Sequence, residues 1–475
     1  MIKTVFSAHP ITIWRGIKRY FFILIIPFIR AALQYLMRGK VDGLFVIETI
    51  AAGFVLTIAI FDWKSIKITV NDRYIAIKRG ILIKKCARIE LSVLSSISLK
   101  RDLFDLLFGS VSCSINTEAG KPQKSDFDIK MSVNDANMLY NLIYDTKNMQ
   151  NIKFSALRIA LLAATTSSAV TGMIIGVPVL NEVCKLVGIA LSDVLINGID
   201  VTTAKFNAFF PPIINFVTII AIFAYTISFV TTFLKNANFR LKSGKGNIEV
   251  RSGLIVQKKI MFSKTRVNNI CLEQTPLMHL INKYCMRASI GGYGDKKGEK
   301  AIIVPVASQN DLKGHLKTYF SQTNTNKKGI APEQKPCNLR RFLYIPAIIA
   351  HVLILVGSVL IIMFPYLSRL VVFLTAIAIV VDLYYGGVCY HNYKNGGLCL
   401  EKQIIAFGSV RFTIRELYCA KEKVGVIKIT ETPADRRHDT CKVKITVRGE
   451  AADSVKVKNI DKNDVLLKIK STFKE

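Results

Sequence analysis

Two clusters of basic residues are the strongest candidates for chemistry in this sequence, because each lies around or just after a glycine turn between two predicted strands. One cluster surrounds Gly80 and the other follows Gly253. Their members are Lys78, Arg79, Lys84, Lys85, Arg88, Lys258, Lys259, Lys264 and Arg266. A Lys or Arg that reaches an anionic membrane surface contributes about 1 kcal/mol to binding, so four or five together predict a lipid-binding face. The alternative is a solvated basic face, since runs of charge are usually solvated.

One further cation, Arg30, lies inside an apolar run that begins at Tyr20. A charge at that depth in a membrane is costly and usually faces protein or water, which predicts a lipid, ion or carboxylate partner inside a helix bundle. The alternative is that the Arg30 side chain snorkels toward the surface near Arg38, with Pro27 bending the helix. The sequence leaves both interpretations open and identifies no partner.

No residues have the spacing of a catalytic or metal site. The ten cysteines include no C-x-x-C pair, and no histidine stands at zinc-like spacing. The segment Gly244-Lys245-Gly246 lacks the residue order of a phosphate-binding loop. The six histidines and the Ser-rich stretches give no nucleophile with a nearby base. We therefore expect no enzyme activity, no metal and no cofactor, and we expect the thiols to be small buried side chains.

The composition is that of a chain whose surroundings alternate between lipid and water. Hydrophobic residues make up 51% of the sequence, and 65 Lys and Arg against 33 Asp and Glu give a net charge of +32. Nucleic acid, an anionic membrane leaflet and membrane topology each account for such an excess. The long apolar runs favour the last two. Nucleic acid is not expected as a partner, because the basic residues lack the interleaved aromatics of a single-strand platform.

Long apolar runs predict six membrane-spanning helices arranged as three hairpins, in a multi-pass α-helical membrane protein with β-rich soluble domains. Each run has roughly the 20 residues needed to cross a hydrocarbon core. The runs are 20–37, 41–61, 154–180, 206–234, 343–364 and 367–385. We interpret the first as an uncleaved span, because no small-residue cleavage site follows it. Gly172 and Gly176 form a small-x-x-x-small pair that permits close helix packing.

The positive charges orient the chain. Arg19 precedes the first run, Lys235 follows the fourth, and Arg340 and Arg341 precede the fifth, whereas the connections on the other side hold few basic residues. Because basic flanks are retained in the cytoplasm, we expect both termini and all three soluble segments to be cytoplasmic. We expect an N-terminal arm at 1–19 and hairpins at 20–61, 151–234 and 341–386. We expect soluble domains at 62–150, at 235–340, which includes a linker, and at 387–475.

Each soluble segment is predicted to contain several strands followed by one helix. The residues from Ile66 to Val70 and from Tyr74 to Ile77 alternate with a period of two, as strands with one buried face do. Ser132, Ser308 and Asp461 stand where the three closing helices begin, each ahead of an apolar helical pattern.

The most specific signal is an internal repeat with an offset of 173 residues. This offset places Arg79-Gly80-Ile81-Leu82 over Ser252-Gly253-Leu254-Ile255, and without a gap it places Ile97 over Ile270. A third copy begins near Gly396 but has no clear counterpart of the leucine-rich segment at 106–109. The repeating unit is therefore a hairpin followed by a soluble domain, and the third domain is divergent.

These motifs resemble the membrane-flanked bacterial pleckstrin-homology-like (PH-like) domain family. The resemblance rests on a basic residue before Gly-Ile, an Ile-rich strand, a leucine-rich turn ending in glycine, and a strand closing in Ala-Gly. The matching segments are Lys78-Arg79-Gly80-Ile81, Ile97-Ser98-Leu99, Leu106-Leu107-Phe108-Gly109 and Thr117-Glu118-Ala119-Gly120. The second copy departs from this pattern at Leu280-Ile281-Asn282, which lacks the glycine. The resemblance of the third copy rests mostly on its position in the chain.

The resemblance implies that each soluble domain is a partly open antiparallel β-barrel with a C-terminal helix, in a protein of the bacterial plasma membrane. It also implies a non-enzymatic role in the cell envelope, in envelope stress or antimicrobial tolerance. We therefore favour a scaffold whose domains bind anionic phospholipid of the inner leaflet or other proteins, including a related membrane-flanked protein. The alternative is a transporter or lipid-moving protein, but Arg30 stands almost alone as an ionisable group within the spans.

Overall fold

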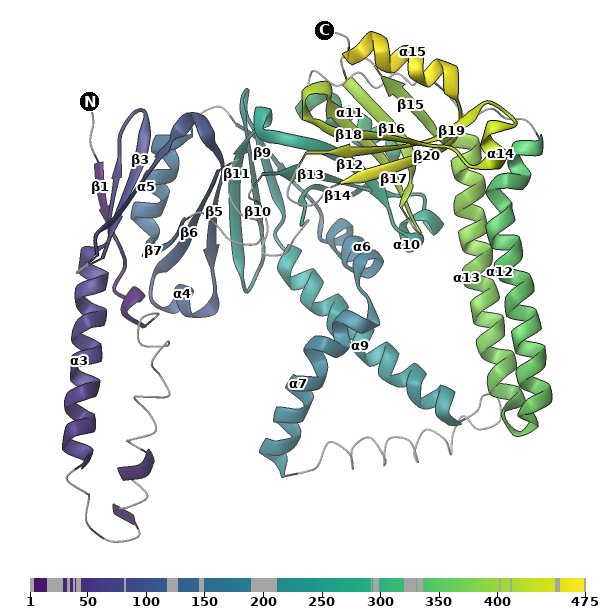
Figure 1. The fold of residues 1–475 in the computed structure, drawn as a ribbon. Helices are drawn as coiled ribbons and strands as arrows, with labels where there is room; N and C mark the ends of the chain where they lie inside the picture. The colour runs from purple at the N-terminus through teal and green to yellow at the C-terminus, as the bar shows by residue number, and fades with distance from the viewer. Residues whose placement is uncertain are drawn as a thin grey trace. The chain divides into compact units, whose positions relative to one another are not determined.

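The chain folds into two compact units (Figure 1). The first consists of Met1–Ile152, Arg240–Arg266 and Ile290–Lys297, and the second consists of Lys153–Phe239, Val267–Ser289 and Gly298–Glu475. This computed structural model describes residues 4–14, 29–31, 35–36, 39, 44–80, 83–117, 127–144, 149–188, 212–291, 293, 299–319, 330, 336–400, 403–410, 412–448 and 453–473.

The same order of elements occurs three times along the described chain: three strands, a 3₁₀ turn, a strand, a short helix, two strands and a closing helix. The first set is β2 (Lys67–Val70), β3 (Tyr74–Arg79), β4 (Lys85–Glu90), η1 (Leu91–Val93), β5 (Leu94–Arg101), α4 (Leu103–Leu107), β6 (Ser110–Thr117), β7 (Phe127–Ser132) and α5 (Val133–Ile143).

The second and third sets repeat this order. The second set is β9 (Arg240–Ser243), β10 (Asn247–Ser252), β11 (Gln257–Ser263), η2 (Lys264–Arg266), β12 (Val267–Gln274), α10 (Pro276–Leu280), β13 (Tyr284–Ile290), β14 (Ala301–Ala307) and α11 (Gln309–Tyr319). The third set is β15 (Gly397–Leu400), β16 (Gln403–Val410), β17 (Thr413–Ala420), η4 (Lys421–Lys423), β18 (Val424–Thr430), α14 (Pro433–Arg436), β19 (Thr440–Val447), β20 (Ser454–Asp461) and α15 (Lys462–Phe473).

The strands form three sheets, two of which join strands of neighbouring sets. Two additional strands, β1 (Thr4–Ser7) and β8 (Gln150–Lys153), extend the first two sheets. The first sheet has the order β1-β2-β3-β4, and the second has the order β7-β6-β5-β11-β10-β9-β8. The third has the order β14-β13-β12-β17-β16-β20-β19-β18, with β15 paired to β16. Consequently β5 pairs with β11 inside the first unit, and β12 pairs with β17 inside the second.

This topology corrects the expectation of a separate barrel for each domain, because the described strands form no closed barrel. The outer edges of β5 and β12 are hydrogen-bonded to β11 and β17, which belong to the following set. A strand pairs with one neighbouring strand along each of its two edges. An edge that is already hydrogen-bonded to a strand of the next set therefore cannot close a barrel within its own set.

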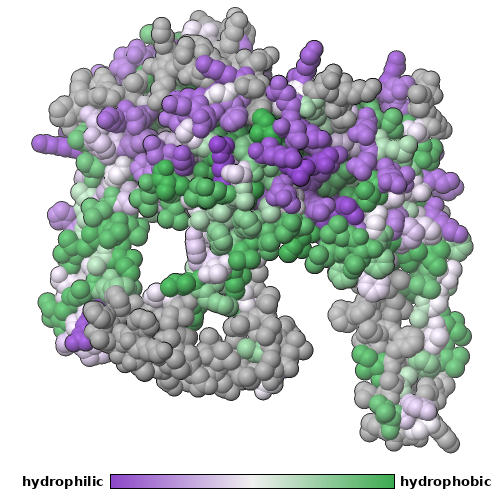
Figure 2. All heavy atoms as spheres, turned by 180° about the vertical axis from the view of Figure 1, so that it is seen from behind, coloured by the Kyte–Doolittle hydropathy of each residue, from purple (hydrophilic) through white to green (hydrophobic). Residues whose placement is uncertain are grey.

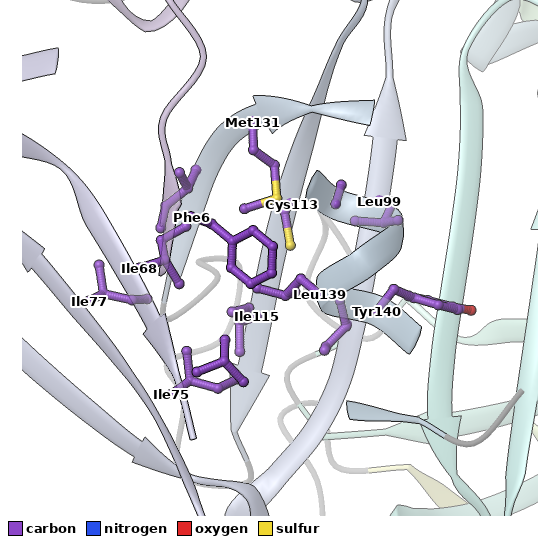
Figure 3. Close-up of a cluster of buried hydrophobic side chains, with 14 of the residues drawn as sticks. Phe6, Ile68, Ile75, Ile77, Leu99, Cys113, Ile115, Met131, Leu139 and Tyr140 are labelled. Atoms are coloured by element: carbon purple, nitrogen blue, oxygen red, sulfur yellow. The ribbon is translucent and has the colours of Figure 1, made fainter. Parts of the chain in front are cut away.

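The core of the first unit is formed by the inward-facing residues of its strands. Ile68, Ile75 and Ile77 are buried, as the period-two alternation predicted. They meet Leu139 and Tyr140 of α5, and Figure 3 shows these side chains converging from the strands and the helix. Burial of this apolar surface is the main force that holds the strands together.

The three closing helices begin at the predicted residues. The hydroxyl of Ser132 accepts the backbone N–H of Asp135 at 3.1 Å, and the hydroxyl of Ser308 accepts that of Asp311 at 3.3 Å. The carboxylate of Asp461 accepts a backbone N–H three residues later at 2.9 Å. Each side chain satisfies one of the N–H groups that a helix leaves without an internal partner at its start.

Three described helices are long and apolar enough to cross a membrane. They are α3 (Leu44–Ser65), α12 (Pro336–Met363) and α13 (Ser368–Asn395). The last two are joined by the 3₁₀ turn η3 (Pro365–Leu367) and lie side by side (Figure 1). Six spans in three hairpins are therefore not found among the described residues. Most of the predicted first span, 20–37, lies outside them.

The predicted third span, 154–180, is broken into two helices. α6 (Ala156–Thr166) and α7 (Ala169–Val187) meet at a bend of 91°, and together they pass as one further span only if the bent pair is counted as one. Leu162 of α6 is buried in a cluster with Met278 and Val306. One face of α6 therefore packs on the β-domain, and such a helix face is as apolar as one that faces lipid.

The predicted close packing at Gly172 is found where α7 crosses α9 (Pro212–Asn236). A Cβ atom added to Gly172 would overlap the backbone carbonyl of Ala224. We expect Gly172→Ala to lower the stability of the purified chain by about 1–3 kcal/mol, because the two backbones must separate. Gly53→Ala in α3 is the control, since nothing lies within 4 Å of its added Cβ. Thermal unfolding in detergent tests this, and equal effects of the two substitutions would contradict it.

Candidate membrane interface

The glycine turn of the first set lies against the end of the membrane-spanning candidate α3. The Arg79 guanidinium pairs with the Asp62 carboxylate at 2.8 Å, and the backbone N–H of Gly80 donates to the Ser65 hydroxyl at 3.0 Å. Gly80 has a φ of +109°, and a Cβ at this position would overlap the carbonyl oxygen of Ile83. Glycine is therefore required for the turn, and the turn is held at the border of the α3 span.

Four of the predicted lipid-binding residues lie at this turn: Lys78, Arg79, Lys84 and Lys85 are all exposed. Ile83 between them is also exposed, at 75%. Exposed cations around an exposed apolar side chain suit a membrane surface, because the cations meet headgroups while the apolar group enters the acyl boundary.

A second exposed turn of the first unit carries large apolar side chains. In and beside α4, Leu103 is 58% exposed, Phe104 72%, Leu107 80% and Phe108 62%. Such a concentration of exposed apolar surface marks an interaction site rather than ordinary surface. Figure 2 shows hydrophobic residues gathered over the helices and their adjoining turns, while hydrophilic residues gather over the strands.

Asp105 fixes the α4 turn from inside, which leaves the apolar side chains outside. Its side chain is fully buried and accepts hydrogen bonds from Ser110 and Lys130, both at 2.6 Å, and from the backbone of Asp102 at 3.3 Å. Burial alone would raise the pKa of Asp105, but the hydrogen bonds from Lys130 and Ser110 outweigh it and hold the pKa below its ordinary value. These hydrogen bonds tie the turn that carries Phe104 and Leu107 to Ser110 and Lys130 of the neighbouring strands.

The basic turn and the apolar turn lie at the same end of the first set. β4 runs from the turn at Gly80 to the 3₁₀ turn η1, and β5 runs from η1 to α4. Figure 1 shows α4 at the end of the first unit where α3 joins its strands. Strands of 6 and 8 residues separate η1 from the two turns, so both turns lie roughly 20–26 Å from η1 at the usual rise per residue. Because the Gly80 turn touches the end of α3, α4 lies at the end of the first set that adjoins the candidate span.

The second set has a comparable apolar turn at α10. Leu277 is 43% exposed, Leu280 76% and Ile281 42%. Buried Met278 anchors this turn, and it stands 173 residues after Asp105, so an apolar anchor replaces the carboxylate. In the third set the short helix α14 is polar and carries no comparable apolar surface among its described residues.

The missing glycine of the second and third sets has a physical explanation. Gly109 ends the α4 turn with a φ of +64°, and Asn282 and Asp439 stand at the same place with φ of +49° and +52°. Asn and Asp tolerate this left-handed conformation better than other residues with side chains. The sequence comparison treated Asn282 as a departure from the pattern, although it preserves the backbone conformation.

The other predicted basic residues do not join the cluster at Gly80. Arg88 lies in the middle of β4, 4.0 Å above the Tyr74 ring. Lys258 lies near the Gly253 turn, and its ammonium is 4.9 Å from the ring of Tyr293. The remaining two, Lys264 and Arg266, belong to η2, at the opposite end of β11 from the Gly253 turn.

Lys259 is directed into the first unit. Its ammonium lies 3.5 Å from the Tyr140 ring and 3.9 Å from the Glu249 carboxylate, whose other oxygen pairs with Arg251 at 2.5 Å. Burial lowers the pKa of Lys259 to about 8. This lysine serves the interior of the sheet that joins β5 and β11.

Sequence reasoning did not identify the apolar turns as a functional surface. The signal was present, since Leu103-Phe104 and Leu106-Leu107-Phe108 follow the basic pair Lys100-Arg101 after one intervening residue. Arg30 is half-buried in a short helical stretch. Among the described residues, no group of three or more His, Cys, Asp or Glu could hold a metal ion.

The comparisons with known proteins identify a family for two of the three sets. The family model of the bacterial PH domain matches the chain over residues 21–147 and again over residues 187–319, more than half of its length. Both matched regions contain an exposed apolar turn, α4 in the first and α10 in the second. No curated protein and no solved structure matches the chain.

Proposed function

The chain belongs to the bacterial PH domain family, and on this premise we propose that it is a non-enzymatic scaffold of the bacterial plasma membrane. Its spans anchor it, and its first two β-domains rest on the cytoplasmic leaflet through the α4 and α10 turns. The third set leaves its polar turn α14 for other contacts. Such a scaffold acts in the response to envelope stress or in tolerance of antimicrobials, as the family resemblance implies.

The observation that carries this proposal is the pairing of an apolar turn with a basic turn at the end of a span. Phe104 and Leu107 project from a turn anchored by buried Asp105, beside a cluster that is tied to α3 by the Arg79 and Asp62 pair. Fully burying an apolar side chain of this size contributes about 1.5–3 kcal/mol. Anionic lipid adds attraction for the lysines of the Gly80 turn.

Nitroxide labels on the full chain in lipid bilayers test the proposal. A label at Leu107→Cys, in a Cys86→Ser background, is expected to be accessible to oxygen and shielded from a water-soluble nickel complex. Ser92→Cys in η1 is the matched control, because it is exposed and lies at the other end of β5. Bilayers with anionic lipid should deepen the Leu107 label relative to neutral ones. Equal nickel accessibility at both positions would exclude the leaflet contact.

The transporter alternative has weaker support. Transporters place broken helices and polar groups near the middle of the membrane. The break between α6 and α7 lies where α6 leaves the β-domain, since the Thr165 carbonyl at the break accepts a hydrogen bond from Thr275 at 3.1 Å. The break is thus part of the connection between helix and domain. Tightly held lipid after purification, without a discrete protein partner, would favour the transporter.

A further inference from the structure

The two junctions between sets use the same register. At the first junction Ile97 of β5 lies opposite Met261 of β11, and at the second Ile270 of β12 lies opposite Tyr418 of β17. Each isoleucine is six residues after the start of its own 3₁₀ turn, and each partner is three residues before the next one. The same antiparallel strand register therefore joins neighbouring sets at both junctions of the chain.

The same two kinds of edge remain at the ends of the sheets. β4 is the counterpart of β11 and β17, and β18 is the counterpart of β5 and β12, because each pair flanks a 3₁₀ turn. β4 ends the first sheet and β18 ends the third, so neither has a strand on its outer side among the described residues. An edge strand with unpaired backbone groups is a template for another strand.

The exposure of β18 fits an absent neighbour. Ile97 and Ile270 are 0% and 4% exposed, whereas their counterpart Ile427 is only partly buried on the core of the third set. Val426 beside it is 58% exposed. A strand paired with the outer edge of β18 would cover these side chains. At the first junction Met261 of β11 packs in this way with the core residues of β5.

We propose that β18 of one copy of the chain pairs antiparallel with β4 of a second copy, head to tail, in the register of the two internal junctions. This register places Thr430 opposite Lys85, Ile429 opposite Cys86 and Val426 opposite Ile89. It creates no directly opposed like charges, whereas the first internal junction tolerates Lys100 opposite Lys258. The contact joins two different surfaces, so it extends into a ring or an open row.

The two copies share one membrane plane in this arrangement. β4 starts beside the Gly80 turn, which touches the end of α3. β18 ends immediately before α14, the counterpart of the membrane-side turns α4 and α10. Pairing Thr430 with Lys85 thus brings the membrane-side ends of both strands together, and the spans of both copies remain in one bilayer.

Disulfide cross-linking in isolated membranes tests the register. The full chain with Lys85→Cys, Thr430→Cys and Cys86→Ser is coexpressed with two different tags and then oxidised. Opposed residues in neighbouring strands have the Cα separation of roughly 4.4–6.8 Å that a disulfide requires. We expect dimers and larger products that carry both tags. Lys85 and Thr430 are exposed, so these substitutions leave the core intact.

The matched control shifts the pair by one residue. Thr430→Cys with native Cys86 places the thiols on opposite faces of the sheet, and it should give no such products. The proposal is overturned by the absence of product, by equal product from the shifted pair, or by a disulfide that leaves the chain at monomer mass. A product that contains one copy joined to another protein also overturns it. None of these results affects the leaflet contact of α4, which the nitroxide labels report independently.

Discussion

Replacing Glu273 with alanine is expected to destabilise the β12–β17 junction by about 3–5 kcal/mol, because it leaves buried cations without their main partner. The Glu273 carboxylate lies 2.8 Å from Lys300, 3.3 Å from Arg415 and 3.5 Å from Arg287. The Glu273 side chain is 8% exposed. After its removal, Asp453, which lies 2.9 Å from Lys300, is the remaining carboxylate in this described cluster.

The control for Glu273 is Lys100→Ala, at the equivalent position of the first junction. Lys100 pairs with Asp102 at 3.7 Å, and both side chains are exposed, so this pair contributes little. Hydrogen exchange of the full chain in detergent should show faster exchange of the β12 and β17 amides in Glu273→Ala alone. Unchanged protection of these amides would show that the cluster does not stabilise the junction.

The ionised Glu273 carboxylate also predicts that the β12–β17 junction loses stability in acid. Burial opposes ionisation of Glu273, but Lys300, Arg287 and Arg415 lower its pKa from the ordinary 4.5 to about 2. A depressed pKa contributes stability that is complete above the unfolded value and is lost as the pH falls toward the folded value. Protection of the β12 and β17 amides should therefore decline between about pH 4.5 and pH 2.

Replacing both Phe104 and Leu107 with glutamate is expected to release the first β-domain from the leaflet. Each substitution removes about 1.5–3 kcal/mol of apolar transfer and adds a charge that anionic lipid repels. The affinity of the turn for the bilayer should fall by about 100-fold or more. Both side chains are more than 70% exposed, so the fold should remain intact.

A nitroxide at Ile83→Cys in the Gly80 turn, in the Cys86→Ser background, reports this release in the full chain. Its nickel accessibility should rise in the double variant and stay low in the parent. Met138→Glu on α5 is the control, because Met138 is a comparably exposed apolar residue outside the two turns. A label at Ile83 that stays shielded after both substitutions would show that α4 does not hold the domain on the membrane.

The sequence predicted the local structure of each set well. Alternating residues such as Ile75 and Ile77 identified strands, and Ser132, Ser308 and Asp461 identified the starts of the closing helices. These features depend on residues that are close in sequence, so their periodicity and capping chemistry are visible in a single chain.

The joining of neighbouring sets could not be read in the same way. Backbone hydrogen bonds make the β5–β11 and β12–β17 pairs, and backbone groups are identical in every strand. Side chains offered partial evidence, since Glu273 opposite Arg415 is a complementary pair only once the register is known. The packing of α6 on the β-domain could not be read from the sequence for a related reason, since Leu162 is equally suited to lipid and to a protein core.

Sharing of sheets across sets means that no single set can be excised without damage. A fragment that stopped after α5 would present the whole outer edge of β5, where Ile97 now lies against Met261, to the solvent. Such a fragment should self-associate through that edge rather than remain monomeric. Natural insertions and deletions should accordingly concentrate in the loops between strands, and loss of one set should compromise its neighbour as well.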